Sequence, residues 1–185
     1  MSVIVIEFIT LDGVVEDPDG RGGTPGGGWA FRFGPDAVAG DKFRLGPLFD
    51  SGVMLLGRRT WELFAQIWPG RDDEFSAHMN AIPKLVASGT LSDTGAWANS
   101  RLMEGDLVDV VQQERRDVVI TGSLSIVHRL MAADLIDEYR LKAFPTVLGT
   151  GARLFPDGGT PADLRTLSVE PDGASVLTRY GRPAA

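Results

Sequence analysis

Short apolar segments alternate with longer amphipathic segments along nearly the whole chain, and this alternation constrains the fold more than any other feature. Short runs of aliphatic and β-branched residues are typical of strands. Strands are expected over residues 3–10, 53–56, 84–87, 118–121 and 136–144. Helices are expected from Pro35 to about Asp50, and over residues 58–68, 72–80, 104–116 and 123–133. Strands that alternate with helices form a largely parallel sheet whose faces the helices cover.

The end of the chain departs from this alternation. A turn signal at Pro171-Asp172-Gly173 predicts a closing hairpin, which adds an antiparallel edge to the sheet. The predicted fold class is therefore α/β, with a mixed, mostly parallel sheet flanked by helices. No stretch with the composition of a linker divides the 185 residues, which predicts a single domain over residues 1–185.

Charge and cysteine content exclude several classes of function. The chain contains no cysteine, which rules out disulfides, thiolate nucleophiles and cysteine-bound metals and fits a reducing compartment. Its net charge of −7 opposes binding to nucleic acids and to anionic membranes, so an anionic ligand needs a local basic site. No apolar run is long enough to span a bilayer, and the first residues lack the basic flank of a signal peptide. We therefore expect a cytoplasmic protein.

A basic turn follows the strand predicted at residues 53–56. In open α/β sheets, ligands bind beyond the carboxyl ends of the strands. There, Gly57 permits a tight turn, and the next helix opens with Arg58, Arg59 and Thr60. Free N–H groups and the positive end of the helix dipole favour an anion at such a helix start. The alternative is that both arginines face water and that Thr60 only caps the helix.

Three other strand ends carry polar residues with two open interpretations each. Ser123 follows Gly122 and can cap a helix or donate to a phosphate oxygen. Ser88 and Thr90 can bind a ribose or its phosphate, or form a plain turn. Asp12 can orient a polar substrate or relay a proton, whereas an ordinary Asp-Gly turn needs no function.

Two further patterns do not indicate sites. Gly149-Thr150-Gly151 resembles part of a dinucleotide-binding fingerprint, but it lacks the third glycine and lies in a strand-rich region. His78 and His128 lie on predicted helices without a nearby metal-ligating partner, so no metal site is predicted.

Seven segments match the motifs of one superfamily in the correct order. They are Thr10-Leu11-Asp12-Gly13-Val14, Gly28-Trp29-Ala30-Phe31, Leu55-Leu56-Gly57-Arg58-Arg59-Thr60, Trp97-Ala98-Asn99-Ser100, Thr121-Gly122-Ser123, Leu135-Ile136-Asp137-Glu138-Tyr139-Arg140-Leu141, and Pro145-Thr146-Val147-Leu148-Gly149-Thr150-Gly151-Ala152-Arg153-Leu154-Phe155. The ordered set resembles the dihydrofolate-reductase-like superfamily and, more closely, stand-alone relatives of the reductase domain of riboflavin biosynthesis. The markers of a true dihydrofolate reductase and of the zinc deaminase domain are absent, so the resemblance does not extend to the substrate.

This resemblance implies an NADPH cofactor that lies across the strand ends described above. The 2′-phosphate and pyrophosphate would bind at the basic turn, the adenosine ribose phosphate after the strand at 84–87, and the nicotinamide ribose after the strand at 118–121. The implied cofactor-binding residues are Gly57, Arg58, Arg59, Thr60, Ser88, Thr90, Gly122, Ser123, Leu124 and Ser125.

The resemblance also implies catalytic and substrate residues. Asp12 and Glu138 are the predicted catalytic carboxylates, and Trp29 and Phe31 are candidates for an aromatic pocket wall. Residues 13–29 match a mobile segment that covers the nicotinamide, with its glycines as hinges. For Trp61, core packing is the favoured role.

The expected activity is hydride transfer from NADPH to a small substrate of pterin, flavin-precursor or carbonyl type, similar to that of 5-amino-6-(5-phosphoribosylamino)uracil reductases. The alternatives are a non-catalytic NADPH- or metabolite-binding domain and a dimeric scaffold with a degenerate site. Relatives commonly form homodimers, so a homodimer is expected.

Overall fold

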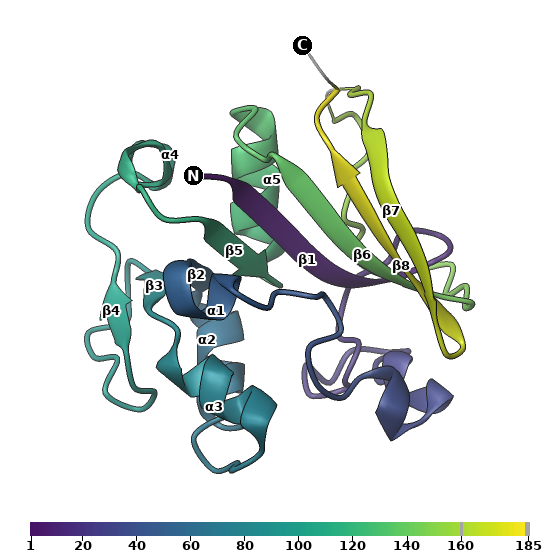
Figure 1. Ribbon diagram of the computed structural model, residues 1–185, viewed down its shortest axis with the longest axis horizontal. Helices are drawn as coiled ribbons and strands as arrows, with labels where there is room; N and C mark the ends of the chain where they lie inside the picture. The colour runs from purple at the N-terminus through teal and green to yellow at the C-terminus, as the bar shows by residue number, and fades with distance from the viewer. Residues whose placement is uncertain (160, 184–185) are drawn as a thin grey trace. The chain divides into compact units, whose positions relative to one another are not determined.

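The chain folds as two units, in a computed structural model that describes residues 1–159 and 161–183. Unit 1 comprises Met1–Ile4 and Leu45–Ile136, and unit 2 comprises Val5–Arg44 and Asp137–Ala185. Strand β1 (Val3–Thr10) is drawn in purple near the N-terminus in Figure 1. Its first residues belong to unit 1 and the others to unit 2. The expectation of one domain stays a prediction.

Unit 1 contains a parallel set of four strands in the order β4-β3-β2-β5, of which β2, β3 and β5 are largely buried, with the start of β1 beside β5. Leu55 lies opposite Leu85 on one side and Ile120 on the other, which sets the register of the central strand. Strands covered on both faces are typically continuous apolar runs, as β2 and β5 are. The strands are β2 (Val53–Gly57), β3 (Lys84–Ala87), β4 (Ser100–Leu102) and β5 (Val118–Thr121).

The helices of unit 1 are shorter than the sequence pattern predicts. The helix expected over residues 104–116 begins only at Leu107, because Asp106 caps it with a bond from the Val108 N–H and Gly105 has a φ of +96°. The helices are α1 (Leu48–Ser51), α2 (Arg58–Ala65), α3 (Glu74–Ala81), α4 (Leu107–Gln113) and α5 (Leu124–Ala132).

The helix expected from Pro35 to about Asp50 is wrong. A 3-10 turn forms at Pro35–Ala37, and α1 begins only at Leu48. Gly40 and Gly46, with φ values of +74° and +47°, turn the chain out of the right-handed helical region between them. The short strand β4 was not predicted at all.

The buried charge of Lys84 is satisfied by three backbone carbonyl groups. The fully buried Lys84 ammonium donates to the carbonyl oxygens of Asn80, Ile82 and Ala98 at 2.8–3.2 Å and lies 4.3 Å from the centre of the Trp97 ring. Burial lowers the pKa of this lysine to about 8. Lys84 therefore ties the end of α3 to the segment before β4.

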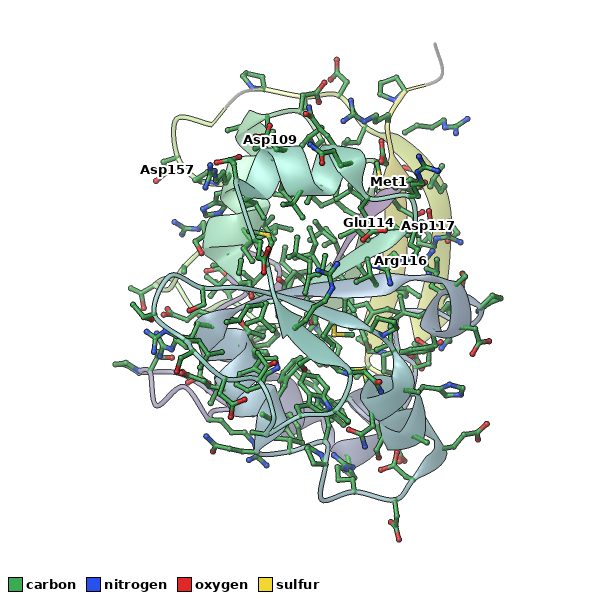
Figure 2. All side chains as sticks on the ribbon, turned by 90° about the vertical axis from the view of Figure 1, so that its left-hand side faces the viewer. Met1, Asp109, Glu114, Arg116, Asp117 and Asp157 are labelled. Atoms are coloured by element: carbon green, nitrogen blue, oxygen red, sulfur yellow. The ribbon has the colours of Figure 1, made fainter. Side chains whose placement is uncertain are left out.

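Beside the start of β1, charged residues gather at the segment before β5 (Figure 2). The Ser2 amide donates to the Asp117 carboxylate at 2.7 Å, and the Met1 amino group lies 3.8 Å from the same carboxylate. Nearby in sequence, Arg116 pairs with Glu114 at 2.7 Å and lowers the pKa of that carboxyl to about 2. The contacts of Met1 and Ser2 with Asp117 hold the start of β1 beside β5, and the Arg116–Glu114 pair is local to the segment before β5.

Unit 2 contains the remainder of β1 and three further strands, in the order β1-β6-β8-β7. Strand β8 pairs antiparallel with both β6 and β7, which confirms the predicted closing hairpin. No helix among the described residues has the length and apolarity needed to cross a membrane. The strands are β6 (Glu138–Phe144), β7 (Arg165–Asp172) and β8 (Ser175–Gly181).

The core of unit 2 is an aromatic cluster around the buried Phe144 ring. The rings of Phe8, Trp29 and Phe33 have centroids 5.3–5.7 Å from that of Phe144. Edge-to-face and tilted arrangements at such distances are the favourable geometries for aromatic pairs. This cluster packs the segment after the glycine-rich stretch against β1 and β6 within the unit.

Candidate active site

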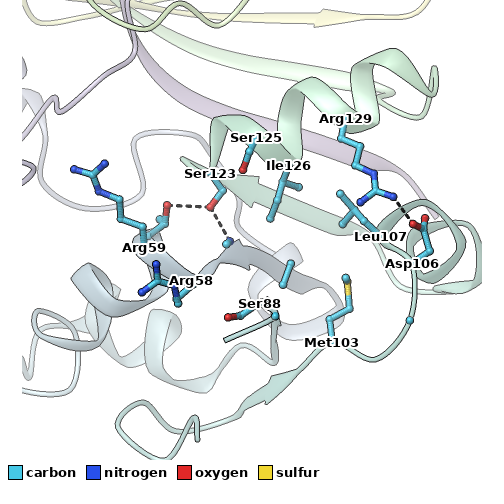
Figure 3. Close-up of a pocket in the computed structure, with 15 residues that line it drawn as sticks. Arg58, Arg59, Ser88, Met103, Asp106, Leu107, Ser123, Ser125, Ile126 and Arg129 are labelled. Carbon is cyan, nitrogen blue, oxygen red and sulfur yellow. Dashed lines mark hydrogen bonds and ion pairs between the residues drawn. The ribbon is translucent and has the colours of Figure 1, made fainter. Parts of the chain in front are cut away.

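Two strand-to-helix turns meet in unit 1, because β2 and β5 are neighbours in the sheet. The Ser123 hydroxyl accepts a hydrogen bond from the Gly57 N–H at 2.8 Å and donates to the Thr60 hydroxyl at 2.9 Å (Figure 3). Ser123 therefore does not cap its own helix. Neither α2 nor α5 has a side-chain cap, so N–H groups of both first turns stay available to an anion.

Glycines make this close approach of the two turns possible. A Cβ atom on Gly122 would lie 3.1 Å from the Thr60 methyl group, and one on Gly57 would lie 3.3 Å from the Ser123 hydroxyl. Gly122 also has a φ of +59°, a conformation that favours glycine. The two turns, residues 57–60 and 122–123, therefore pack and bond to each other as one interlocked element.

A pocket of about 620 Å³ opens at this element, within the range of sites for small molecules and cofactors. Its lining comes from the turns after β2, β3, β4 and β5 and from α5 (Figure 3). The lining residues are Gly57, Arg58, Arg59, Thr60, Ala87, Ser88, Gly89, Met103, Gly105, Asp106, Leu107, Ser123, Ser125, Ile126 and Arg129.

The pocket is locally basic, with three arginines and one carboxylate in its lining. Arg58 lies 3.3 Å from Glu62 one turn further along α2, and both side chains are exposed, so this pair is weak and easily exchanged. Arg59 forms no ion pair with any residue of 1–159 or 161–183. Together with the two helix starts, these arginines concentrate positive potential in a chain whose net charge is −7.

Apolar side chains line the other part of the pocket. Leu107 and Ile126 are buried, and Met103 is half-buried. Beyond them, Arg129 on α5 forms an ion pair with Asp106 (Figure 3). Sequence reasoning missed this group, because the three-residue strand β4 was not recognised and its carboxyl end was not searched. The signal that could have revealed it is Gly105-Asp106, a glycine and a helix-capping carboxylate in succession.

The structure brings most of the predicted cofactor residues together. Those that line the pocket are Gly57, Arg58, Arg59, Thr60, Ser88, Ser123 and Ser125. Thr90, Gly122 and Leu124 do not line it. Ser88 also accepts bonds from the amides of Thr90 at 3.2 Å and Leu91 at 2.9 Å, so it has the turn-forming role that the sequence left open. The role of the predicted cofactor-binding residues stays a prediction.

Asp12 lies in unit 2, where it joins two segments of the chain. Its carboxylate accepts bonds from the Thr10 hydroxyl at 2.6 Å and from the amides of Gly149 and Leu148 at 2.7 and 3.3 Å. The bond from Thr10, followed by that from Gly149, lowers the pKa of Asp12 to about 2. The carboxylate is ionised at neutral pH, so it cannot act as a proton donor there.

Glu138, also in unit 2, is held between two arginines. Arg140 and Arg179 donate to its carboxylate at 2.8 and 2.7 Å. Burial opposes ionisation of Glu138, but the two guanidinium groups outweigh it and lower the pKa. Arg140 donates as well to the carbonyl oxygens of Phe43 and Arg44, at 3.1 and 2.6 Å. In this arrangement Glu138 orients Arg140, which anchors a distant stretch of the chain.

The predicted aromatic residues differ in exposure. Trp29 is fully buried, and its indole N–H donates to the Glu16 carbonyl oxygen at 2.8 Å. The structure therefore places Trp29 in the core of unit 2 rather than on a pocket wall. Phe31 is 52% exposed and remains accessible to a ligand. Trp61 is buried and donates to the Ser100 hydroxyl at 2.9 Å, as expected for a core residue.

No group of three or more potential metal ligands occurs in the part of the chain that the structure describes.

Comparisons with known proteins agree with the fold. The family model for the RibD C-terminal domain matches residues 1–178. An uncharacterised Bacillus subtilis (strain 168) protein, YyaP, is 24% identical over 183 residues, which cover 95% of this chain and 91% of that protein.

Solved structures show the same fold at low sequence identity. A putative riboflavin biosynthesis protein from Shewanella sp. PV-4 superposes with a TM-score of 0.72 at 21% identity, with both chains fully covered. A pyrimidine reductase-like protein from Corynebacterium diphtheriae gives 0.66 at 11% identity, covering 100% of this chain and 92% of that one.

The third structure is a diaminohydroxyphosphoribosylaminopyrimidine deaminase/5-amino-6-(5-phosphoribosylamino)uracil reductase from Thermotoga maritima. It gives a TM-score of 0.60 at 15% identity, over 98% of this chain but only 56% of that one. Because the family model covers nearly the whole sequence, the chain belongs to the RibD C-terminal domain family.

Proposed function

We propose that this protein is an NADPH-dependent reductase that transfers hydride to a small substrate of pterin, flavin-precursor or carbonyl type. Membership of the RibD C-terminal domain family and the reductase names of two structural neighbours support a reductase. The pocket in unit 1 supports the cofactor, because it combines helix starts, arginines and an apolar part in a volume of about 620 Å³.

The observation that carries the proposal is the state of Arg59. This guanidinium lies in the pocket lining without an ion pair among the described residues, beside two helix starts that lack side-chain caps. Cations near the positive end of a helix dipole reduce stability unless an anion compensates them. A dinucleotide phosphate supplies that anion, and the planar guanidinium fork matches its oxygens.

The residues present fit such a group. Gly57 and Gly122 let the two turns pack closely, so the uncapped starts of α2 and α5 lie at one pocket, where backbone N–H groups can receive a pyrophosphate. Arg58 and Arg59 would hold phosphate oxygens, and the Ser88 and Ser125 hydroxyls would donate to ribose or phosphate. When bound, the dinucleotide supplies the hydride, while the protein supplies position and electrostatics. We assign no proton transfer to Asp12 or Glu138, because both carboxylates are held ionised.

The test compares cofactors in a double variant, Arg58→Ala with Arg59→Ala. We expect affinity for NADPH to fall by about tenfold to a hundredfold and affinity for NADH to fall much less, because charge-assisted bonds to the 2′-phosphate are lost. Isothermal titration calorimetry measures the dissociation constants for NADPH and for NADH. Arg71→Ala is the matched control, since its side chain, like that of Arg58, is 52% exposed but lies outside the pocket lining. Equal losses for the two cofactors would contradict the role given to the arginines.

One observation favours a second candidate, a non-catalytic NADPH- or metabolite-binding domain. Both predicted catalytic carboxylates are occupied by contacts within unit 2, Asp12 by backbone amides and Glu138 by arginines. This candidate predicts tight NADPH binding without oxidation of the cofactor over a panel of pterins, flavin precursors and quinones. Absorbance of the reduced nicotinamide separates the two. The expected homodimer and cytoplasmic location stay predictions.

A further inference from the structure

The arginines of the pocket are of two kinds. Arg59 forms no ion pair with a described residue, whereas Arg129 is paired with Asp106, and both members of this pair line the pocket. Their side chains are 54% and 44% exposed, so the pair faces the pocket opening and is not part of the core. Arg59 therefore offers a ligand a positive charge that pairs with no described residue, whereas Arg129 offers a guanidinium whose charge Asp106 partly offsets.

Asp106 is held in place by its position in the backbone. One carboxylate oxygen accepts the Val108 N–H at 2.8 Å as the cap of α4, and the other contacts Arg129. The bond from Val108, aided by Arg129, lowers the pKa of Asp106, so the carboxylate remains charged at neutral pH. Because the backbone bond from Val108 anchors Asp106, its negative charge stays beside the Arg129 guanidinium although both side chains are partly exposed, and it repels a phosphate that approaches.

Apolar side chains lie beside the pair on its pocket side. Met103, Leu107 and Ile126 lie between the pair and the serines at the other part of the pocket (Figure 3). A guanidinium whose charge a neighbouring carboxylate partly offsets, beside aliphatic side chains, offers a planar surface on which an uncharged aromatic ring stacks. This part of the pocket thus suits a flat, neutral group, in contrast to the anion-binding part at Arg58 and Arg59.

We propose that Asp106 and Arg129 form a selectivity pair: Arg129 stacks on the base of the bound nucleotide, and Asp106 prevents Arg129 from capturing phosphate. This inference rests on the proposed function. It assigns the phosphates of the nucleotide to Arg58 and Arg59 and the base to Arg129. It makes Arg129 a determinant of base recognition and Asp106 a determinant of the orientation in which the nucleotide enters.

The test uses two probes on the full chain by isothermal titration calorimetry: adenosine 2′,5′-bisphosphate, which carries a base, and inorganic pyrophosphate, which does not. Arg129→Met keeps an aliphatic side chain of similar length but removes the guanidinium plane. We expect it to weaken the adenosine probe by about tenfold, as for loss of a partly desolvated cation–π contact, and to weaken pyrophosphate clearly less, because only repulsion from the unpaired Asp106 acts on that probe. Arg115→Met, at an exposed arginine of unit 1 outside the pocket lining, is the matched control.

Asp106→Asn tests the second half of the proposal. Asparagine caps helices as well as aspartate does, so α4 keeps its acceptor while the ion pair loses its charge. The released Arg129 should then strengthen pyrophosphate binding by about tenfold, through charge-assisted hydrogen bonds. Thermal unfolding of each variant verifies that it is folded.

The outcomes separate this inference from the proposed function. If the wild-type chain binds neither probe, the proposed function fails and the inference with it. If the wild type binds the adenosine probe but Arg129→Met binds it equally well, the selectivity pair alone is overturned. A similar loss of both probes in Arg129→Met would show that Arg129 binds phosphate, which also overturns it, and so would unchanged pyrophosphate binding in Asp106→Asn.

Discussion

At the scale of single residues, the partners of a carboxylate determine what it can do. Asp12 follows a strand in the position of a catalytic acid, yet its oxygens are taken by the Thr10 hydroxyl and by two amides of a segment more than 130 residues away. A carboxylate that accepts several hydrogen bonds is stabilised in its charged form. Its contribution is therefore to hold residues 10–14 and 146–154 together within unit 2.

This role predicts a pH dependence. The folded-state pKa of Asp12, about 2, lies below its ordinary value of 3.8, so its ionised form contributes stability above about pH 4. That contribution is lost as the pH falls from about 4 to about 2. We expect Asp12→Asn to lower the free energy of unfolding at neutral pH, and its difference from the wild type to shrink over this range. Urea unfolding of both proteins at several pH values measures this difference in the free energy of unfolding.

Asp163→Asn, at an exposed carboxylate of the same unit, is the control and should change stability little. A difference between Asp12→Asn and the wild type that stayed constant down to about pH 2 would show that ionisation of Asp12 does not support the fold.

At the scale of elements, the glycines of the loops serve close packing. In the glycine-rich stretch, the Asp17 carboxylate accepts the amides of Gly22 and Thr24 at 2.7 and 2.9 Å. A Cβ atom on Gly27 would lie 2.3 Å from that carboxylate. The glycines predicted as hinges of a mobile segment here allow the loop to wrap around an ionised side chain.

The interlocked turns of unit 1 give a prediction at the same scale. Gly122→Ala places a methyl group against Thr60 and forces an alanine into the left-handed region, so we expect a loss of about 1–2 kcal/mol in the free energy of unfolding. NADPH binding should weaken too, because the turns separate. Chemical denaturation and titration calorimetry measure the two effects.

Gly70→Ala is the matched control, since nothing lies within 4 Å of a Cβ atom there and no positive φ opposes it. Adding Thr60→Ser to Gly122→Ala removes the methyl group that clashes and should restore part of the stability. No recovery would mean that backbone strain alone accounts for the loss.

At the scale of the whole molecule, the candidate cofactor pocket draws its lining from unit 1 only. A ligand that binds the native state suppresses local opening around its site. Hydrogen exchange followed by mass spectrometry, with and without NADPH, should therefore show protection in the turns after β2, β3 and β5. The β7–β8 hairpin of unit 2 should be unchanged. Protection confined to unit 2 would contradict the assigned pocket.

Much of the fold was predictable because it depends on local properties. The runs at residues 53–56, 84–87 and 118–121 are apolar enough to be strands wherever they lie, and all three form strands with nearly the predicted bounds. The basic turn at Arg58 and Arg59 was recognisable because a strand end, a glycine and two arginines follow one another. Strand β4 was not predicted, because three residues carry no periodic signal.

The sequence by itself determined the alternation of strands and helices, the closing hairpin and the basic character of one strand end, since each is encoded within a few consecutive residues. Only the tertiary structure decided that Ser123 bonds Gly57 and Thr60, that Asp12 binds Gly149, and that Arg129 meets Asp106. These partners lie 23 to 137 residues apart. A hydroxyl or carboxylate can bond many partners, and folding selects the one that the sheet brings within reach.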